Sequence, residues 1–409
     1  MVIMSGLPMP GPIPGLQDLV SILAQAANDP LVTEHPSVDH GLLSGIAALL
    51  SIDITTGKPG QDQCVEDAWN TVQDAKAGKT NPLDMANTPA GSSIYPKSKE
   101  DAPYSVEEDD LRAAIYIPES FQYGKNRKKP VILVLGTAVP AGLTYYFSFG
   151  RLAEVVPEAD VVWVNIPSTS SEDVAVTSEY IAYATNYISA VSESNVAIIA
   201  WSQGNLNTQW SFKYWPSTRD VVYNYIAISP DYHGTVLADA ICPLLTGIFC
   251  PPAFFQQRYE TDFIEALRAD GGGSAYVPTT TVYSTFDEIV QPQSGPNASA
   301  ILDDNGKVGV SNNHAQTVCA NQPAGGLYTH EGMLYNPLTW ALAADALRHG
   351  GPGNVSRIDT KEVCADVLAP QLGPDDLLGS EGLILVAVAE SLAYAPKPLK
   401  EPPVASYAL

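Results

Sequence analysis

The sequence is poor in basic side chains, and this limits the partners that the chain can attract. Its 409 residues contain 21 Lys and Arg against 45 Asp and Glu, so the formal net charge is -24 at pH 7. Such a chain is repelled by nucleic-acid phosphates and by anionic membrane surfaces. We therefore expect no nucleic-acid partner, and we expect a neutral or acid-tolerant partner instead.

Long hydrophobic runs are also missing. The two longest, residues 41–54 and 382–395, are shorter than the roughly 20 residues that a membrane-spanning helix needs. The first residues, MVIMSGLPMPGPIPG, contain neither a basic n-region nor an apolar h-region. We therefore expect no membrane span, and we see no secretory signal in the sequence as given.

Cysteine is scarce, with Cys64, Cys242, Cys250, Cys319 and Cys364 only. No two of them have the CxxC spacing that is typical of structural zinc sites, so no metal is expected. An odd number leaves at least one cysteine unpaired. Cys242 and Cys250 enclose a short loop flanked by prolines, CPLLTGIFC, for which a disulfide is favoured over free buried thiols.

The composition supports a sizeable core, because 45% of the residues are apolar and only 16% are charged. The length fits one large α/β domain with an extension, or two domains. Residues 1–105 are rich in Pro, Gly, Ser and Asp, with helical patterns at 16–28, 38–51 and 64–77. We predict that they form an N-terminal extension, either a propeptide or a cap, to a catalytic domain of residues 106–409.

Several apolar runs predict strands, and most of them are typical of strands buried on both faces. Segments of helical length separate them, such as residues 171–191. This alternation predicts an α/β fold with a mostly parallel central sheet flanked by helices. Functional residues of such sheets gather beyond the carboxyl ends of the strands. The predicted strands are residues 111–118, 131–136, 161–167, 196–201, 221–229 and 279–286.

A serine stands directly after the third buried run, where a helical pattern begins. Ala200-Trp201-Ser202-Gln203-Gly204 resembles the nucleophile elbow G-x-S-x-G, with Ala in place of the first Gly. The elbow is a tight strand-to-helix turn, so the residues two before and two after the serine must be small. We favour Ser202 as a nucleophile over the alternative of a helix N-cap serine.

A serine nucleophile needs a base, and the base needs an orienting carboxylate. In α/β-hydrolases the acid and then the histidine follow the serine along the chain. Asp287 follows the strand predicted at 279–286 and is favoured as the acid, whereas Asp231 is expected to be a polar residue beside the site. A solvated turn aspartate is the alternative for either.

Three histidines follow Asp287 in the chain. His349 is typical of a helix C-terminus beside a glycine cap, and His314 lies in the polar run SNNHAQ. His330 follows the flexible AGGLYT and leads into a helix, so we favour it as the base. On spacing alone, its advantage over His314 is small.

Acyl transfer also needs donors for the oxyanion. One should be the backbone N–H of Gln203, the residue after the serine. The loop after the strand at 131–136 should supply the other, from Thr137 beside Gly136.

Over residues 110–400, the sequence resembles the fungal lipase B family of serine lipases in the α/β-hydrolase superfamily. The resemblance rests on linked segments, of which VPTTTVYSTFDEIVQPQ is the most specific. The others are PVILVLGT, AWSQGNLNTQW, SPDYHGTVLA, FFQQ, EALRADGG, AQTVCANQPAGGLYTHEG and a tail ending AYAPKPLKEPP.

The resemblance implies roles for individual residues. Ser202, Asp287 and His330 match the catalytic triad, and Thr137 and Gln203 match the oxyanion donors. Cys319 and Cys364 match a disulfide of the family. Residues that match substrate-binding positions are Trp201, Asp231, Gln257, Ile289 and Leu392.

The resemblance further implies a lipase that cleaves lipid-like esters, such as acylglycerols, through an acyl-enzyme. It would need no metal or organic cofactor, act as an extracellular monomer and contact a lipid–water interface transiently. The alternatives are a soluble carboxylesterase or acyltransferase without true lipase activity, and a catalytically silent binding protein with the same fold.

Overall fold

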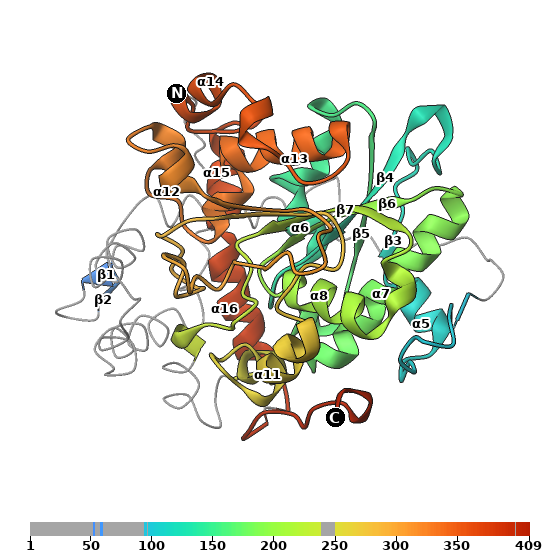
Figure 1. Cartoon of the computed structure of the whole chain (residues 1–409). Helices are drawn as coiled ribbons and strands as arrows, with labels where there is room; N and C mark the ends of the chain where they lie inside the picture. The colour runs from blue at the N-terminus through green and yellow to red at the C-terminus, as the bar shows by residue number, and fades with distance from the viewer. Residues whose placement is uncertain (1–51, 54–57, 60–93, 96, 239–249, 397) are drawn as a thin grey trace, which may run out of the picture.

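A seven-stranded sheet forms the centre of the computed structural model, which describes residues 52–53, 58–59, 94–95, 97–238, 250–396 and 398–409 (Figure 1). The strand order is β3-β5-β4-β6-β7-β8-β9. All neighbours are parallel except β3, which pairs antiparallel with β5. The predicted α/β class with a mostly parallel sheet is thereby confirmed. The strands are β3 Ile115–Tyr116, β4 Lys129–Val134, β5 Ala159–Val164, β6 Val196–Trp201, β7 Val222–Ile228, β8 Thr279–Tyr283 and β9 Val310–His314.

Helices cover both faces of this sheet. Helices α7 and α8 pack together on one side, while α13 packs on β7 and β8 from the other side (Figure 1). The helix predicted at 171–191 is confirmed as α7. The helices are α5 Glu108–Ala113, α6 Ala141–Tyr146, α7 Val174–Ser192, α8 Gly204–Tyr214, α10 Pro252–Gln256, α11 Asp262–Arg268, α12 Ala315–Val318, α13 Pro337–His349, α14 Thr360–Ala365, α15 Pro374–Glu381 and α16 Leu383–Ala393.

Two predictions about the edges of the sheet differ from the structure. The strand expected at 111–118 is wrong in its first half, because residues 108–113 form α5. Three acidic residues in the first turn and Arg112 in the last suit the helix dipole. Strand β9 was not predicted because its sequence, VSNNH, is polar. It lies at the edge of the sheet, where only one of its two sides pairs with a neighbour.

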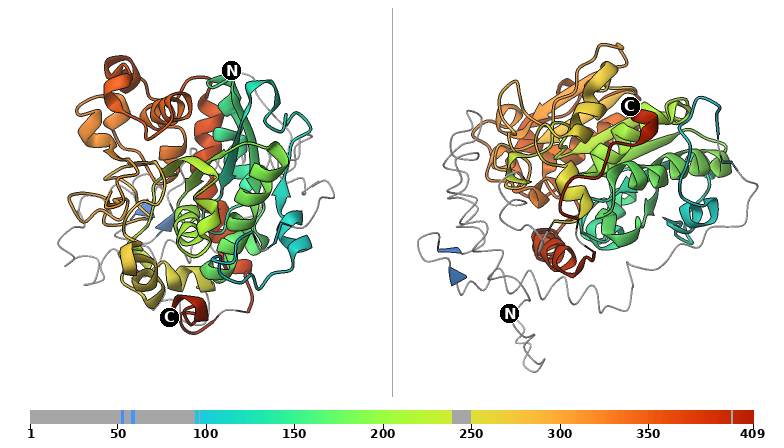
Figure 2. Two further views of the ribbon diagram at one scale, coloured as in Figure 1. Left: turned by 45° about the vertical axis from the view of Figure 1, so that its right-hand side comes forward. Right: turned by 90° about the horizontal axis from the view of Figure 1, so that it is seen from below.

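Segments near both ends of the described chain pack on α7, α8 and α11. Glu179 of α7 accepts hydrogen bonds from the N–H and hydroxyl of Ser105. The indole N–H of Trp210 in α8 donates to the Tyr407 hydroxyl at 3.0 Å. Figure 2 shows the C-terminal segment beside α11 from two further sides. A division of the chain at residue 105 stays a prediction, and the helices predicted at 16–28, 38–51 and 64–77 lie outside the described residues. Within the described ranges, no helix has the length and apolar character of a membrane span.

Helix α8 crosses strand β4 very closely at Gly204. A Cβ atom on Gly204 would lie 2.6 Å from the backbone oxygen of Leu135 and 2.7 Å from that of Val134. Both atoms are backbone oxygens at the end of the buried strand β4, so neither can move aside easily. The small residue that the elbow pattern requires two positions after Ser202 therefore has a steric cause.

We expect Gly204→Ala to destabilise the protein by about 1–3 kcal/mol, because the added methyl group overpacks this crossing. Urea unfolding followed by circular dichroism measures the change. Gly306→Ala is the matched control, since the nearest atom to its added Cβ is 3.7 Å away. Equal stability of the two variants would contradict the steric argument.

Candidate active site

Ser202 occupies a strained turn between β6 and α8. Its φ is 56°, a left-handed conformation that is uncommon for a residue with a side chain. The N-cap of α8 is Gln203, so the structure does not use Ser202 as the N-cap serine of the alternative interpretation. The Ser202 N–H donates to the Ile228 oxygen at 3.1 Å, which anchors the turn to the end of β7. This geometry is that of a nucleophile elbow.

Asp287 and His330 form a buried pair beyond the end of β8. The Nδ1 atom of His330 lies 2.8 Å from Oδ2 of Asp287. The other carboxylate oxygen of Asp287 accepts from the N–H groups of Ile289 at 3.0 Å and Val290 at 2.7 Å. An imidazole whose Nδ1–H donates to a carboxylate presents an unprotonated Nε2. That nitrogen is buried and has no hydrogen-bond partner in the described part of the chain.

Trp201 brings the end of β6 to the imidazole. Its indole N–H donates to the backbone oxygen of His330 at 3.1 Å, and the two rings are 4.9 Å apart. On the other side, a Cβ atom at Gly136 would lie 2.9 Å from the Cβ of Ser202. The serine therefore packs close to the loop after β4, while its neighbour Trp201 contacts the segment that carries His330.

A polar cluster lies next to Ser202. The Thr137 hydroxyl donates to Oε1 of Gln203 at 2.6 Å and lies 3.0 Å from Oε1 of Gln257. The Gln203 amide donates to the Ser170 oxygen and hydroxyl. Residues 168–170 all have positive φ, and the backbone oxygen of Thr169 accepts from Ala138 at 2.7 Å. This supporting turn was missed by the sequence analysis, since its residues carry no turn signal of the Gly or Asn-Gly kind.

Several carboxyl groups determine the electrostatics of His330. Burial lowers the pKa of His330, but the neighbouring Asp287, Glu288 and Asp231 outweigh burial and raise it above its usual value. Asp231 follows β7 and is fully buried, and neither of its oxygens has a hydrogen-bond partner in another described residue. Burial raises the pKa of Asp231 to about 7, although His330 opposes this rise.

The other two candidate histidines contact residues other than Asp287. His314 ends β9 and contacts the hydroxyls of Thr285 at 2.6 Å and Thr317 at 2.7 Å. His349 ends α13 and lies 2.9 Å from a carboxylate oxygen of Asp345. In the described ranges, no group of three or more His, Cys, Asp and Glu residues is arranged to hold a metal ion.

The predicted substrate-binding residues lie on several elements. Gln257 is buried, and its amide donates to Oε1 of Gln203 at 3.1 Å. Ile289 is half-buried, and its backbone oxygen accepts from Thr235 at 2.7 Å. Leu392 belongs to α16, and its side chain is not among the described ones. Their contact with a substrate stays a prediction.

Three glutamates near His330 were missed by the sequence analysis. Glu288 follows Asp287 directly and accepts from the backbone N–H of His330 at 2.8 Å. Glu331 follows His330 directly and is buried. Glu381 reaches the same segment from the end of α15. Glu288 and Glu331 each follow a candidate triad residue directly, which the sequence shows. The burial of these two glutamates, however, depends on elements that are far apart in the chain.

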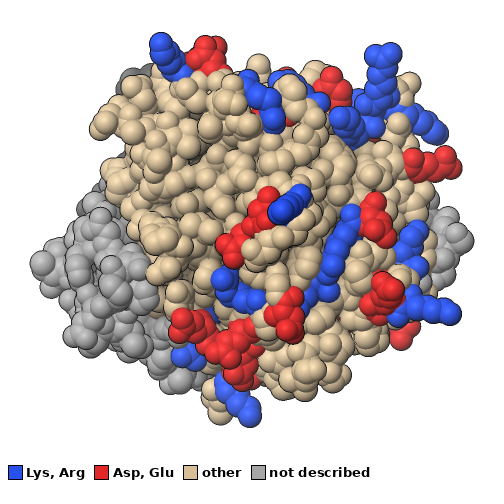
Figure 3. All heavy atoms as spheres, in the orientation of Figure 1, with Lys and Arg blue, Asp and Glu red and all other residues tan. Residues whose placement is uncertain are grey.

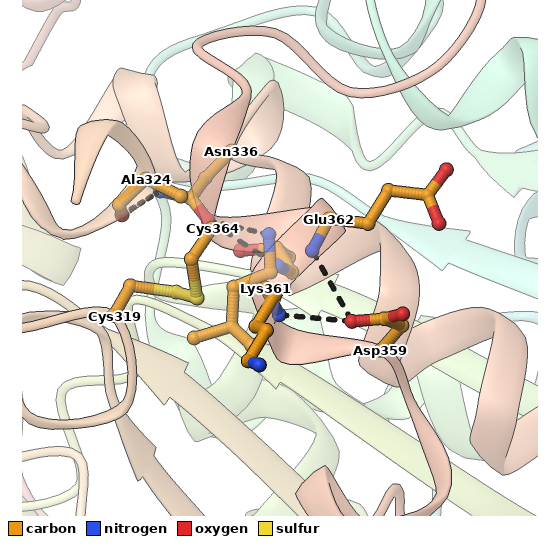
Figure 4. The surroundings of a disulfide bond; sticks show 9 residues. Cys319, Ala324, Asn336, Asp359, Lys361, Glu362 and Cys364 are labelled. Atoms are coloured by element: carbon orange, nitrogen blue, oxygen red, sulfur yellow. Dashed lines mark hydrogen bonds between the residues drawn. A yellow bond between two sulfur atoms is a disulfide. The ribbon is translucent and has the colours of Figure 1, made fainter.

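A disulfide closes the segment that carries His330. Cys319, after α12, is bonded to Cys364 in α14 across a sequence separation of 45 residues, which confirms the pairing implied by the resemblance (Figure 4). In the same view, Asp359 caps α14 and Asn336 donates to the Ala324 oxygen at 2.8 Å. Cys250 is also disulfide-bonded, but the predicted partner Cys242 lies outside the described residues.

The sheet, its flanking helices and the turn at Ser202 define the chain as an α/β-hydrolase. No family model matches it. Lipase B of Pseudozyma antarctica is 33% identical over 286 residues, which cover 68% of this chain and 79% of that protein. The crystal structure of Aspergillus fumigatus lipase B is 54% identical with a TM-score of 0.77, and the match covers 96% of this chain and 100% of that one. The chain therefore belongs to the lipase B family and is a carboxylic ester hydrolase.

Replacing both Cys319 and Cys364 by Ala should destabilise the protein by up to about 4 kcal/mol, the chain-entropy value for a loop of this length. Thermal unfolding by calorimetry measures the loss. A reductant should lower the melting temperature of the wild type more than that of the variant, in which only the disulfide of Cys250 is left to reduce. An unchanged melting temperature in the double variant would contradict a stabilising role.

Proposed function

We propose that Ser202, His330 and Asp287 are the nucleophile, the base and the orienting acid of a lipase. The observation that carries this proposal is the Asp287–His330 pair, whose Nε2 has no partner in the described chain, beside a serine on a nucleophile elbow. His330 takes the hydroxyl proton of Ser202 while Oγ attacks the ester carbonyl. The alcohol leaves with this proton, and water activated by His330 then hydrolyses the acyl-enzyme. Asp287 accepts the Nδ1–H hydrogen bond of His330, which orients the imidazole and leaves Nε2 to take the proton.

The oxyanion of each tetrahedral intermediate would be held by Gln203 and Thr137. The N–H of Gln203 lies at the start of α8, where N–H groups have no partner within the helix and the helix dipole favours negative charge. Thr137 offers its backbone N–H and its hydroxyl. The amide oxygens of Gln203 and Gln257 hold the Thr137 side chain in place before substrate arrives, and the hydroxyl would turn from them to donate to the oxyanion.

The substrate would be a lipid-like carboxylic ester such as an acylglycerol. Trp201 is fixed against His330 by its indole hydrogen bond, so it suits the wall of the pocket for the alcohol part. We assign Ile289 and Leu392 to an apolar channel, and Asp231 and Gln257 to the polar border. Both relatives named above are lipases, which favours a lipase over a soluble carboxylesterase or acyltransferase and over a silent binding protein.

We further propose an extracellular monomer that contacts a lipid–water interface transiently. The buried Cys319–Cys364 disulfide suits an oxidising compartment. Two apolar side chains that could contact an interface are exposed, Leu327 by 70% and Val367 by 56%. They belong to neighbouring segments, because the hydroxyl of Tyr328 donates to the backbone oxygen of Val367 at 2.6 Å. Figure 3 shows that charged side chains are sparse near α12 on the face that it draws. Comparing tributyrin emulsions with dissolved short esters tests the interfacial preference.

Ser202→Ala should lower the hydrolysis of p-nitrophenyl butyrate by about 10³-fold or more, because no other group replaces the nucleophile. A fluorophosphonate probe should label the wild type and leave the variant unlabelled. Ser120→Ala removes an exposed hydroxyl and serves as the matched control. A Ser202→Ala variant with near wild-type activity would reject the assignment.

Asp231→Asn should move the acid limb of the kcat/KM profile to lower pH. Catalysis needs neutral His330, so activity falls as the pH drops through the pKa of His330, which the Asp231 carboxylate helps to raise. Removing that charge lowers the pKa of His330 and moves the limb by less than about one pH unit, because Asp231, with a pKa of about 7, is itself partly protonated there. Asp220→Asn, at an exposed position, is the control. A limb that moves to higher pH instead would show that the sign is wrong.

A further inference from the structure

The segment that carries His330 rests on glutamates that the hydrolytic mechanism does not use. Glu288 and Glu331 are buried, with 8% and 2% of their surface exposed. Glu381 is partly buried at the C-terminal end of α15. The three come from the loop after β8, from the histidine segment itself and from a helix near the C-terminus. Their convergence behind one imidazole needs an explanation.

The buried side chains of Glu288 and Glu331 interact through their carboxyl groups, and Oε2 of Glu331 has no hydrogen-bond partner in the described residues. Oε2 of Glu288 also accepts from the backbone N–H of His330 at 2.8 Å. An ionised carboxylate only accepts hydrogen bonds, so a bond between two carboxyl groups requires a proton on one of them. Two adjacent carboxyl groups that are both buried repel each other when both are ionised, so this arrangement favours one proton and one negative charge on the pair.

Glu381 holds the same segment from its other side. Its Oε1 accepts from the hydroxyls of Thr329 at 2.7 Å and Tyr335 at 2.7 Å. The Thr329 hydroxyl in turn accepts from the N–H of Gly332 at 2.8 Å. Carboxyl groups therefore hold both the backbone of His330 and the turn that follows it, within residues 329–335.

The surroundings of the pair contain negative charges and no compensating Lys or Arg among the described groups that act on it. Burial is the main cause that raises the pKa of Glu288, and the negative charge of Asp287 adds to it. The interaction with Glu331 and the charge of His330 oppose this rise. Burial, Glu288 and Glu381 raise the pKa of Glu331 well above its usual value. The titratable groups that face the pair are Asp287 from the loop after β8, His330 and Tyr335 from its own segment, and Glu381 from α15.

We propose that Glu288 and Glu331 are positioning residues that hold His330 through one shared proton, and that loss of this proton sets the alkaline limit of activity. The inference rests on the proposed role of His330 as the base. When the proton leaves, two adjacent buried charges repel each other. Glu288 then no longer presents a fixed acceptor to the His330 N–H, and the imidazole loses its alignment with Ser202.

Glu331→Gln tests whether the titrating proton matters, because this variant keeps a hydrogen-bond donor and removes the titrating group. An amide donates to Glu288 as the protonated carboxyl does, keeps the charge of the pair at one, and does not titrate. We expect kcat on p-nitrophenyl butyrate at pH 7 to stay within about threefold of wild type, and the alkaline midpoint of kcat to rise by about one pH unit or more. Glu331→Ala removes the donor, so kcat should fall about tenfold with KM changed by less than about twofold. Glu119→Gln, at an exposed position, should change neither quantity.

Two further measurements keep the test decisive if Glu331→Gln folds poorly. Glu288→Gln also preserves a donor to its partner and an acceptor for the His330 N–H, so it should raise the alkaline midpoint as well. The infrared band of protonated carboxyl groups that the wild type has and Glu331→Gln lacks should disappear along the alkaline limb of activity. The proposal is overturned if both amide variants keep the wild-type midpoint, or if this absorption is absent at neutral pH.

Failure of the proposed function has a different signature. If His330 were not the base, His330→Ala would retain both esterase activity and fluorophosphonate labelling. Fluorophosphonate labelling that is lost in His330→Ala, together with an unmoved alkaline midpoint in the amide variants, would reject only the role of the glutamate pair.

Discussion

The hydrogen bond between Asp287 and His330 is the contact on which the site depends. It joins the end of β8 to a segment 43 residues further along the chain, and both partners are buried. A buried carboxylate is costly unless donors surround it, and here two backbone N–H groups and one imidazole N–H supply them. The bond therefore fixes the imidazole's position and its tautomer together.

The parallel sheet explains why these groups meet. The carboxyl ends of β4, β6, β7 and β8 lie at one edge, so Thr137, Ser202, Asp231 and Asp287 gather there although 150 residues separate the first from the last. Of the proposed triad, only His330 is not carried by a segment directly after one of these strands. Its segment is consequently the part that needs extra support, and Trp201, Glu288 and Glu381 provide it.

Much of this arrangement was predictable from the sequence. The continuous apolar runs at 131–136 and 196–201 predicted buried strands, and the small residues around Ser202 predicted the elbow. Polar edge strand β9 and helix α5 were missed, because neither has the apolar period on which such predictions depend. Glu288 and Glu331 were missed for another reason. An acidic residue usually lies in solvent, and only the tertiary fold encloses these two with their shared proton.

The disulfide between Cys319 and Cys364 gives the histidine segment a covalent boundary. Every residue from 320 to 363, His330 included, belongs to a ring closed through two sulfur atoms. A single proteolytic cut within that ring would leave the two halves of the enzyme joined. The piece of chain that bears the imidazole would then stay tethered to the sheet, and an intact backbone would not be required to keep the site's components together.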